Sequence, residues 1–580
     1  MLSNQQVAEV FANIADAMEV LGEDRFKAQA YRRASEVLGS LPTSLQDYYA
    51  RGALEDIPGV GAAISTKIAE LLETGRLQFY ERLRAKVPDG VLDVVRVPGV
   101  GPKTAWRLYQ ELGIVGLESL EAAARAGRIR TLKGLGARLE SRILAGLEHR
   151  STGPEQFLLG EALPLARELT SAYRAAQPAL IDVCYAGSLR RSCPTVGDID
   201  LVALAPDPAA ALDAFVALPY AASVERREVS RVDVRLHSGK ACSLFIADPD
   251  TWGAALVMWT GSAAHLERLA QLATERGLTL TESGLRRGAE LMPVRTEADL
   301  YRELGLAFIP PELRENWGEI EAAREGRLPA LVEIGDIRGD LHTHTAWSDG
   351  SGTVMEAAEA AIARGYNYYA ITDHSFYMGM VNGLDAARLK AQRAEIDAAN
   401  AEFVRRGITF RLLQGSEVDI LPDGTLALPD EVLATLDWVV ASLHVSLGQE
   451  RETVTRRLLN AIRNPHVDCI GHPTGRLLLR RTGADLDMEA VLHAAAETGT
   501  VLEVDGSYPR LDLDAEYVKR ALDLGIKISI DSDAHQPGEL DGVDYGVLTA
   551  RRGWASPADV VNTWTWDEIE AYKARRDVHV

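Results

Sequence analysis

The first part of the chain carries apolar residues at helical spacing. Apolar side chains three and four positions apart lie on one face of an α-helix. Two such stripes occur between residues 3 and about 82, formed by Val7, Val10, Phe11, Ile14, Ala15 and Met18, and by Ala30, Ala34, Val37 and Leu38. The pattern predicts an all-helical start.

Seven short apolar runs alternate with helical patterns beyond residue 336, and each run ends in side chains that bind metals. They cover 337–341, 369–372, 411–413, 438–441, 467–470, 501–504 and 528–530. Strand, polar tip and helix in repetition predict a parallel α/β barrel with its site at the carboxyl ends of the strands. Between these two parts, from Gly160 to about Leu236, strand and helix patterns mix.

The barrel region holds nine of the twelve histidines. Nine predicted ligands follow its strands: His342, His344, Asp349, His374, Glu417, His444, His472, Asp533 and His535. Mixed imidazole and carboxylate ligation suits Zn²⁺, Mn²⁺ or Fe²⁺ better than Mg²⁺. So many ligands indicate two or three ions, which would activate water and hold phosphate oxygens during hydrolysis.

The mixed region carries a second acidic constellation. Asp198 and Asp200 stand two apart on a predicted strand, so both carboxylates leave from one face. A second run, 231–236, alternates so that Asp233 lies opposite its apolar side. If the two strands are adjacent, three carboxylates converge on Mg²⁺ or Mn²⁺. The pair alone is also typical of an ordinary polar strand end.

Residues that can hold a triphosphate precede this pair. Gly187 and Ser188 offer backbone N–H groups and a hydroxyl, and Arg190 and Arg191 offer planar cations. Phosphate-binding turns are also expected near the N-terminus, where IPGVG (57–61), VPGVG (97–101) and the weaker LKGLG (132–136) precede helices. Glycine permits a tight turn there, and backbone N–H groups at the helix start can accept a phosphate.

Length and composition limit the number of domains and the ways in which the chain can bind DNA. A chain of 580 residues is too long for one core, and 47% apolar with 25% charged residues is typical of a globular protein. A net charge of −22 argues against binding DNA through bulk charge, so any DNA contact must be local. The beginning shows no signal or membrane segment, which predicts a cytoplasmic protein, and the four cysteines are expected to be reduced thiols.

The motifs GS-x-RR, GDID and RVDVRL together resemble the nucleotidyltransferase palm of family X DNA polymerases, a likeness that covers residues 3 to about 317. The resemblance implies that Asp198, Asp200 and Asp233 are catalytic metal ligands. It further implies that the incoming nucleotide is contacted by Gly187, Ser188, Arg191, Gly197, Trp259 and Gly261. Met258 and Leu266 depart from the family's usual aromatic residue and asparagine, which puts sugar discrimination and base contacts in question.

The glycine turns resemble the helix-hairpin-helix motif, which holds the DNA backbone without reading its sequence. The residues implied are Gly59, Gly61, Gly99, Gly101, Gly134 and Gly136. From its position on the helix alone, Lys67 is predicted to be a surface lysine. In family X enzymes with 5′-deoxyribose phosphate lyase activity, a lysine at this place forms a Schiff base, and Lys27 and Tyr31 fit that pattern, whereas Ala63 replaces an expected second lysine.

The barrel motifs DLHTHTAWSDG, TDH, GSEVDI, GHPTGR and DSDAH resemble the polymerase and histidinol phosphatase (PHP) domain. The likeness implies 3′–5′ exonuclease activity with 3′-end or abasic-site processing. Asp505 stands where relatives often have an asparagine, so it is left outside the ligand set.

These signals predict a multidomain α/β protein. The expected parts are a helical DNA-end-binding, lyase-like domain (1–82), a second helical DNA-binding domain (83–155), a mixed α/β palm (156–240), a nucleotide-selection subdomain (241–317), a linker (318–335) and a distorted (β/α)7 PHP barrel (336–580). The predicted function is gap-filling DNA polymerisation in base excision repair, with deoxynucleoside triphosphates and gapped or nicked DNA as substrates and a monomeric enzyme. Two alternatives stay open: a phosphoesterase of small metabolites with a nucleic-acid-binding front half, and a repair scaffold without catalysis.

Overall fold

The computed structural model describes residues 4–40, 45–57, 59–95, 97, 100–152, 156–377 and 381–576. Its first part is helical, as predicted. The α-helices are α1 (Asn4–Leu21), α2 (Arg25–Ser40), α3 (Leu45–Ala50), α4 (Ala62–Thr74), α5 (Gln78–Arg84), α6 (Asp89–Val95), α7 (Pro102–Leu112), α8 (Leu117–Arg125) and α9 (Ala137–Thr152). One buried cluster joins Phe11, Ile14 and Met18 of α1 to Ala34 and Leu38 of α2, so both predicted stripes reach a common core. Ala30 of the second stripe is exposed, and Ala28 is buried instead.

A five-stranded mixed sheet follows, in the order β2-β4-β7-β6-β5. Its strands are β2 (Asp182–Tyr185), β4 (Ile199–Leu204), β5 (Ala221–Arg227), β6 (Arg231–Leu236) and β7 (Ala241–Ala247). Apolar residues of this sheet share a core with α10 (Leu159–Ala176) and α12 (Pro208–Val216). The two aspartate-bearing strands are not neighbours, as the condition for convergence had supposed: β7 lies between them, parallel to β4 and antiparallel to β6.

A smaller unit packs around a separate core of apolar residues. It contains α13 (Trp252–Thr260), α14 (Ala263–Glu275), the sheet of β8 (Thr279–Thr281), β9 (Gly284–Arg287) and β10 (Glu290–Met292), and α15 (Glu297–Glu303). The expected linker 318–335 contains a helix, α16 (Glu319–Glu325), whose Ile320 and Ala323 are buried in this core. Glu319 is also fully buried, against His265 of α14, so this part of the segment belongs to the unit.

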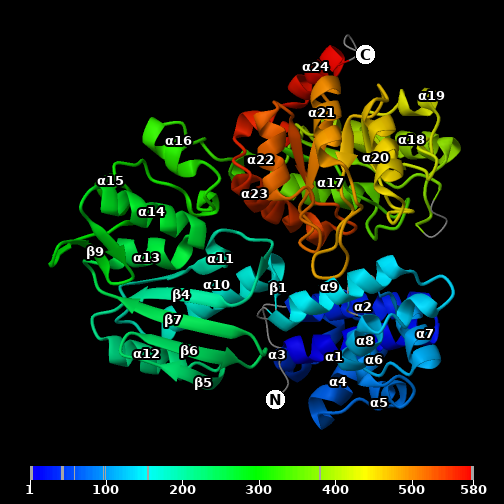
Figure 1. Ribbon diagram of the computed structural model, residues 1–580. Helices are drawn as coiled ribbons and strands as arrows, with labels where there is room; N and C mark the ends of the chain where they lie inside the picture. The colour runs from blue at the N-terminus through cyan, green and yellow to red at the C-terminus, as the bar shows by residue number, and fades with distance from the viewer. Residues whose placement is uncertain are drawn as a thin grey trace.

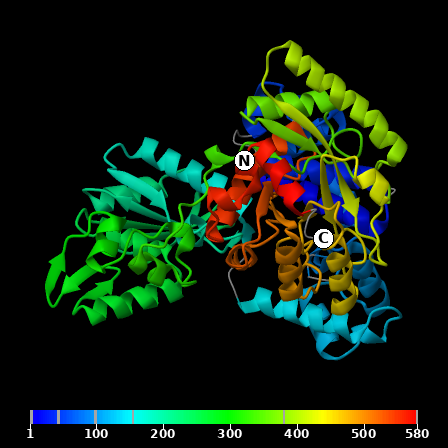
Figure 2. The same ribbon diagram turned by 90° about the horizontal axis from the view of Figure 1, so that it is seen from above.

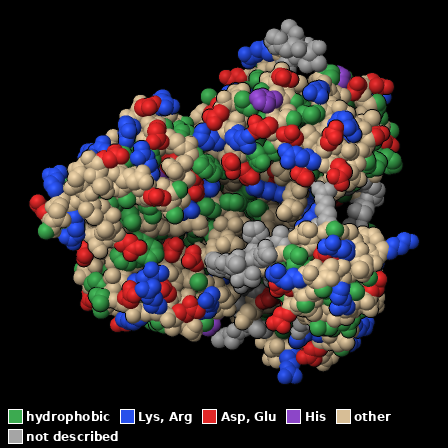
Figure 3. Space-filling model, in the orientation of Figure 1, with side chains coloured by type: hydrophobic (Ala, Val, Ile, Leu, Met, Phe, Trp, Pro, Cys, Tyr) green, Lys and Arg blue, Asp and Glu red, His purple; other side chains and the backbone are tan. Residues whose placement is uncertain are grey.

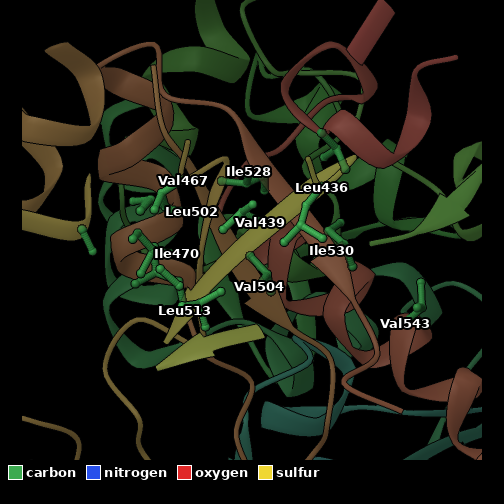
Figure 4. Packing of buried hydrophobic residues seen from close by; sticks show 14 of the residues in the cluster. Leu436, Val439, Val467, Ile470, Leu502, Val504, Leu513, Ile528, Ile530 and Val543 are labelled. Atoms are coloured by element: carbon green, nitrogen blue, oxygen red, sulfur yellow. The ribbon is translucent and has the colours of Figure 1, made fainter. Parts of the chain in front are cut away.

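The C-terminal part is the predicted barrel, with seven parallel strands in chain order. They are β11 (Gly339–Asp340), β12 (Tyr368–Ile371), β13 (Arg411–Asp419), β14 (Trp438–Ser442), β15 (Cys469–Gly471), β16 (Val501–Asp505) and β17 (Ile528–Asp531). The first and last strands approach each other, because the Asp533 N–H donates to the His342 carbonyl and the His344 N–H donates to that of Ala534. Figure 4 shows apolar side chains of β14, β15, β16 and β17 gathered into one core.

Helices surround this sheet. They are α17 (Val354–Ala363), α18 (Ala386–Arg405), α19 (Asp430–Leu433), α20 (Arg451–Ile462), α21 (Met488–Thr498), α22 (Ala515–Asp523), α23 (Gly542–Arg552) and α24 (Trp566–Arg576). The four cysteines are free thiols, as predicted. Among the described helices, none combines the length and the apolar character that a membrane span requires.

Figures 1 and 2 show the middle part of the chain extending to one side, while the N-terminal helices and the C-terminal barrel share the other side. Helix α23 meets the middle part directly: Arg552 donates to the Arg191 carbonyl (3.0 Å) and to Glu315 (2.6 Å). On the face seen in Figure 3, acidic and basic side chains are interspersed rather than separated by sign. The barrel is therefore attached to the middle part by polar contacts as well as by the chain.

Candidate functional site

The palm sheet brings the three predicted carboxylates into one row. Asp200 on β4 and Asp233 on β6 are both in register with Ser243 of β7, the strand between them. Residues in register on neighbouring strands point to the same face, and Asp198 shares that face because it precedes Asp200 by two positions. Arg231 lies beside them, with its Nε 2.8 Å from Asp233 Oδ1.

The electrostatics of this row confirm that the carboxylates influence one another. Burial and the charge of Asp198 raise the pKa of Asp200 to about 7, although Arg231 acts in the opposite direction. Burial also raises the pKa of Asp198, again against the effect of Arg231. Carboxylates crowded in this way favour a proton or a divalent cation, and their oxygens are the ligands that Mg²⁺ and Mn²⁺ prefer.

Gly187 closes one side of this row. Its φ is +63°, and a Cβ at this position would lie 2.4 Å from Asp200 Oδ2. The preceding Ala186 N–H donates to the Asp200 carbonyl over 2.8 Å. The turn that carries Ser188 and short helix α11 (Gly187–Arg190) is thus fixed against β4, and only glycine fits at its start. Gly197 precedes the pair and is half-buried.

The two arginines after this turn are engaged with the smaller unit. Arg190 pairs with Glu297 (2.6 Å), which also takes the fully buried Arg314 at 2.6 Å. Arg191 donates from Nε to Glu315 (2.8 Å) and from Nη1 to the Thr260 carbonyl (2.7 Å). A phosphate bound by Arg191 would have to share or replace the Glu315 contact.

The predicted sugar-contacting segment lies beside the same sheet. The Trp259 ring stacks on Phe245 of β7 with 5.3 Å between centroids, and Arg231 lies 4.8 Å from its centroid. A Cβ on Gly261 would come within 2.8 Å of Leu266. Trp259 thus links the segment after α13 to the row of carboxylates through Arg231, the partner of Asp233.

The glycine turns precede helices as predicted. Gly61 caps α4 and Gly101 caps α7, each in extended conformation, while Gly136 immediately precedes α9. Gly59 and Gly134 hold positive φ values of 76° and 82°. A Cβ added at any of Gly59, Gly61, Gly101, Gly134 or Gly136 would meet nothing within 4 Å, so these turns are open on the outside. Gly99 lies outside the described residues.

Lys67 lies on α4 close to two aromatic rings. Its Nζ is 5.8 Å from the ring centroid of Tyr31 and 5.4 Å from that of Phe79, and it donates to the Ala63 carbonyl at 2.9 Å. Tyr31 is 9% exposed and belongs to the helical core. The amine therefore lies at the edge of an apolar surface. This position is compatible both with a surface lysine and with a lysine that forms a Schiff base.

The barrel brings the nine predicted ligands together at the carboxyl ends of its strands. Glu417 is central: Oε1 lies 2.9 Å from His472 Nε2 and 3.0 Å from His444 Nε2, and Oε2 lies 2.8 Å from His374 Nδ1. Asp533 Oδ1 is 3.1 Å from His344 Nε2. Three groups have ligand atoms within 4.8 Å of one another: His344, Asp349, His374 and His535; His342, His344 and Asp533; and His374, Glu417 and His444.

Several buried atoms of this cluster form no hydrogen bond with another described residue, although Glu417 Oε2 and His374 Nδ1 lie 2.8 Å apart as an ion-pair contact, and such atoms can accept a metal. They are His342 Nε2, His344 Nδ1, His374 Nδ1, Glu417 Oε2 and His472 Nδ1. Burial alone would raise the pKa of Glu417, but the charges of His444, His374 and His342 hold it well below its ordinary value. Buried polar atoms without partners are costly, so a cation that binds them removes a penalty.

The backbone at this site is also strained at two ligands. His472 and Asp533 have φ values of 28° and 51°, in the left-handed region that residues with a Cβ rarely adopt. Such conformations cost on the order of 1–3 kcal/mol each and persist only where the surrounding structure enforces them.

The palm carboxylates do not form a group as tight as the three in the barrel, within the ranges that the structure describes.

Two acidic residues that support the histidines were missed by the sequence analysis. Glu503 Oε1 lies 2.6 Å from His342 Nδ1, and Asp419 Oδ1 lies 2.8 Å from His444 Nδ1. A carboxylate on the second ring nitrogen fixes the orientation of a metal-binding histidine. A signal existed for Asp419, which shares a strand face with Glu417, and for Glu503, an acid inside an apolar strand. Asp505, left out of the ligand set, lies outside the three groups.

Comparison with protein families matches four segments. The profile for a helix-hairpin-helix domain matches residues 2–77, and that for a SAM-like helix-hairpin-helix tandem matches 91–149. The DNA polymerase beta thumb profile matches 255–315, and the PHP domain profile matches 340–508. The matches cover the three glycine turns, the smaller unit of the middle part and most of the barrel.

Comparison with curated proteins gives a relative that spans the whole chain. DNA polymerase/3′-5′ exonuclease PolX of Bacillus subtilis is 37% identical over 580 residues, covering 99% of this chain and all of the relative. DNA polymerase lambda of Rattus norvegicus is 26% identical over 350 residues, 54% of this chain and 58% of the relative. A probable phosphatase of Thermoanaerobacter is 34% identical over 239 residues, 39% of this chain and 89% of the relative.

Proposed function

Because the chain belongs to the bacterial family X DNA polymerases that carry a C-terminal PHP domain, we propose that it is a DNA-directed DNA polymerase with a second, hydrolytic centre. The polymerase fills short gaps during base excision repair, and the PHP barrel removes or repairs 3′ ends and abasic sites with 3′–5′ exonuclease activity. The observation that carries the proposal is the presence of two separate carboxylate-based centres, the palm row and the barrel cluster, in one fold.

At the palm, Asp198, Asp200 and Asp233 hold Mg²⁺ or Mn²⁺ ions. When bound, these ions acidify the primer 3′-hydroxyl and neutralise triphosphate charge. The fixed turn at Gly187 and Ser188 orients the triphosphate with Gly197, and Arg191 contributes its guanidinium after releasing Glu315. Trp259 and Gly261 then contact the sugar of a deoxynucleoside triphosphate.

At the barrel, the nine ligands hold two or three Zn²⁺, Mn²⁺ or Fe²⁺ ions. When bound, these ions lower the pKa of water and polarise the phosphodiester. Glu503 and Asp419 keep His342 and His444 in the orientation that the cluster needs. Burial raises the pKa of Glu503 to about 7, and the charge of His342 opposes this rise.

The remaining assignments concern DNA and cellular setting. Residues 1–82 and 83–155 hold DNA through the backbone N–H groups of their glycine turns, 156–240 form the palm, 241–317 select the nucleotide, and 336–580 form the hydrolytic domain. Lys67 gives lyase activity through a Schiff base with the abasic sugar. The enzyme acts as a monomer on gapped or nicked DNA in the cytoplasm, where bacterial DNA lies.

The experiment is a gapped-DNA assay with and without deoxynucleotides. Wild type, the Asp198→Ala/Asp200→Ala double variant and His342→Ala are compared for primer extension and for 3′-end degradation. The double variant should lose extension and keep degradation, and His342→Ala should show the reverse. Extension by the double variant would refute the polymerase assignment.

A metabolite phosphoesterase is the competing function, because a probable phosphatase matches 39% of this chain, a share close to that of the barrel, over 89% of its own length. The full-length relative named as a polymerase favours DNA instead. Hydrolysis of histidinol phosphate, compared with that of a 3′-recessed duplex, separates the two functions. A metal-free barrel after purification would instead support a scaffold without catalysis.

A further inference from the structure

The loop 507–513, between β16 and α22, contacts both halves of the molecule. On one side it packs on the palm: Leu511 is fully buried in the palm's own core cluster. Tyr508 lies against Gly160 at the start of α10, where an added Cβ would come 2.2 Å from Tyr508 Cγ. Tyr508 also meets Tyr545 of α23 edge-on at 5.9 Å. The palm thus determines where this loop of the barrel lies.

The same loop carries Arg510 into the barrel's metal cluster. Its Nε lies 3.2 Å from Asp505 Oδ2 and 3.7 Å from Asp533 Oδ2. Its side chain keeps 21% of its surface exposed, so a ligand can reach it. Within the part of the chain that the structure describes, neither terminal nitrogen of Arg510 has a hydrogen-bond partner. These two nitrogens carry four N–H donors of a planar cation, which are available beside the predicted metal ligands.

The charges around Arg510 favour an anion as its partner. Asp533 presents Oδ1 to His344 and Oδ2 to Arg510, so Oδ1 would be available to a metal held with His344 while Oδ2 faces the guanidinium. Asp505 lies outside the three metal groups and can stay with Arg510 when the ions bind. With Asp533 neutralised by metal, the guanidinium keeps one carboxylate partner and has terminal donors to spare. Guanidinium binds phosphate oxygens in pairs and with strong directionality.

We propose that Arg510 binds the scissile phosphate at the PHP centre, that Asp505 positions it, and that the palm holds the loop that carries it. The inference rests on the proposed hydrolytic function of the barrel. It predicts that 3′-end removal by the barrel depends on the contact between the palm and the loop 507–513, which involves none of the metal ligands. A substitution at the palm surface should therefore weaken substrate binding in the other half.

The first experiment uses the full chain with Arg510→Gln, Arg510→Lys and the control Arg411→Gln, whose side chain is half exposed at the opposite end of β13. KM and kcat for 3′-end removal are measured at saturating Mn²⁺, together with inhibition by inorganic phosphate and bound metal per chain. Arg510→Gln should raise KM and the phosphate inhibition constant about tenfold to a hundredfold, as expected for a charged hydrogen bond. Arg510→Lys should recover part of the loss, and metal content should stay at the wild-type value.

The result that overturns the proposal is an unchanged phosphate inhibition constant in Arg510→Gln. Loss of metal with unchanged phosphate affinity would also overturn it, because Arg510 would then only orient Asp533. If His342→Ala retained full 3′-end removal, the proposed function of the barrel would fail instead. The two failures are thus distinguishable.

The second experiment tests the anchoring by the palm. Gly160→Ala forces Tyr508 aside, and Tyr508→Ala loosens the same contact without a clash. Gly335→Ala is the control, because a Cβ there meets nothing within 4 Å. Both anchoring variants should raise KM and the phosphate inhibition constant severalfold, with primer extension showing that the palm is intact. Wild-type values for both variants would refute the anchoring.

Discussion

Replacing Asp200 by Asn should stabilise the metal-free palm above neutral pH. The pKa of Asp200 is raised from 3.8 to about 7 by burial and by the charges of Asp198 and Asp233, against Arg231. The folded state therefore holds this proton more tightly than the unfolded chain. The contribution of this bound proton to the free energy of unfolding is fully present below about pH 4 and is lost as the pH rises to about 7.

The magnitude follows from the shift. About three pH units correspond to about 4 kcal/mol, the cost of ionising Asp200 in the folded palm without metal. Asparagine stays neutral, so Asp200→Asn should match wild type at pH 4 and exceed its stability by about 4 kcal/mol at pH 8. Bound Mg²⁺ should remove most of this difference, because it stabilises the carboxylate form.

The assay is hydrogen exchange of the full chain, read on peptides that span β4 and β7 and corrected for the pH dependence of intrinsic exchange. Exchange reports opening of the palm sheet alone, whereas a melting curve of a multidomain chain does not. The control is Asp182→Asn, which removes a carboxylate with 48% of its side chain exposed on β2 of the same sheet. The reasoning is refuted if Asp200→Asn differs from wild type by less than about 1 kcal/mol at pH 8, or equally at pH 4 and pH 8.

Three further predictions follow from other sites. Glu417→Gln should lower the metal bound per chain, and should lower 3′-end removal at least a hundredfold while extension persists, because Glu417 contacts several ligand histidines. Metal analysis checks this against Glu359→Gln, which changes an exposed carboxylate on α17. Lys67→Ala should abolish borohydride trapping on abasic DNA without affecting extension, and Lys86→Ala (60% exposed) should not. Glu297→Ala should destabilise the smaller unit by about 3–5 kcal/mol, seen by exchange in α15, because it leaves two arginines unpaired.

The sequence was most informative where the spacing of apolar residues and the side-chain types that follow them indicate the same structure. Seven apolar runs ending in histidines and acids predicted both the barrel and the gathering of these side chains at one edge, because parallel strands put their carboxyl ends at the same edge. The pair Asp198 and Asp200 was readable for the same reason, since two positions on a strand share a face. The position of β7 between β4 and β6 was not, because strand order depends on packing between distant segments.

Residues whose role depends on a distant partner were the ones missed. Glu503 stands out in the sequence only as an acid within an apolar strand, and its role depends on His342, 161 positions earlier in the chain and 2.6 Å away. The expected linker contains α16 because Ile320 has an apolar core to enter and Glu319 has buried His265 as a partner. Arg510 likewise gains its setting only when the palm and barrel meet around one loop. Such pairings are properties of the assembled fold.

The central claim is that carboxylates distant in sequence build two separate metal centres in one chain. Its most direct test is anomalous diffraction from crystals grown with Mn²⁺, gapped DNA and a non-hydrolysable deoxynucleoside triphosphate. The account predicts one set of peaks touching Asp198, Asp200 and Asp233 beside the triphosphate, and another set touching Glu417 and its histidines. Manganese at the palm that does not touch Asp233, or a triphosphate bound elsewhere, would contradict it.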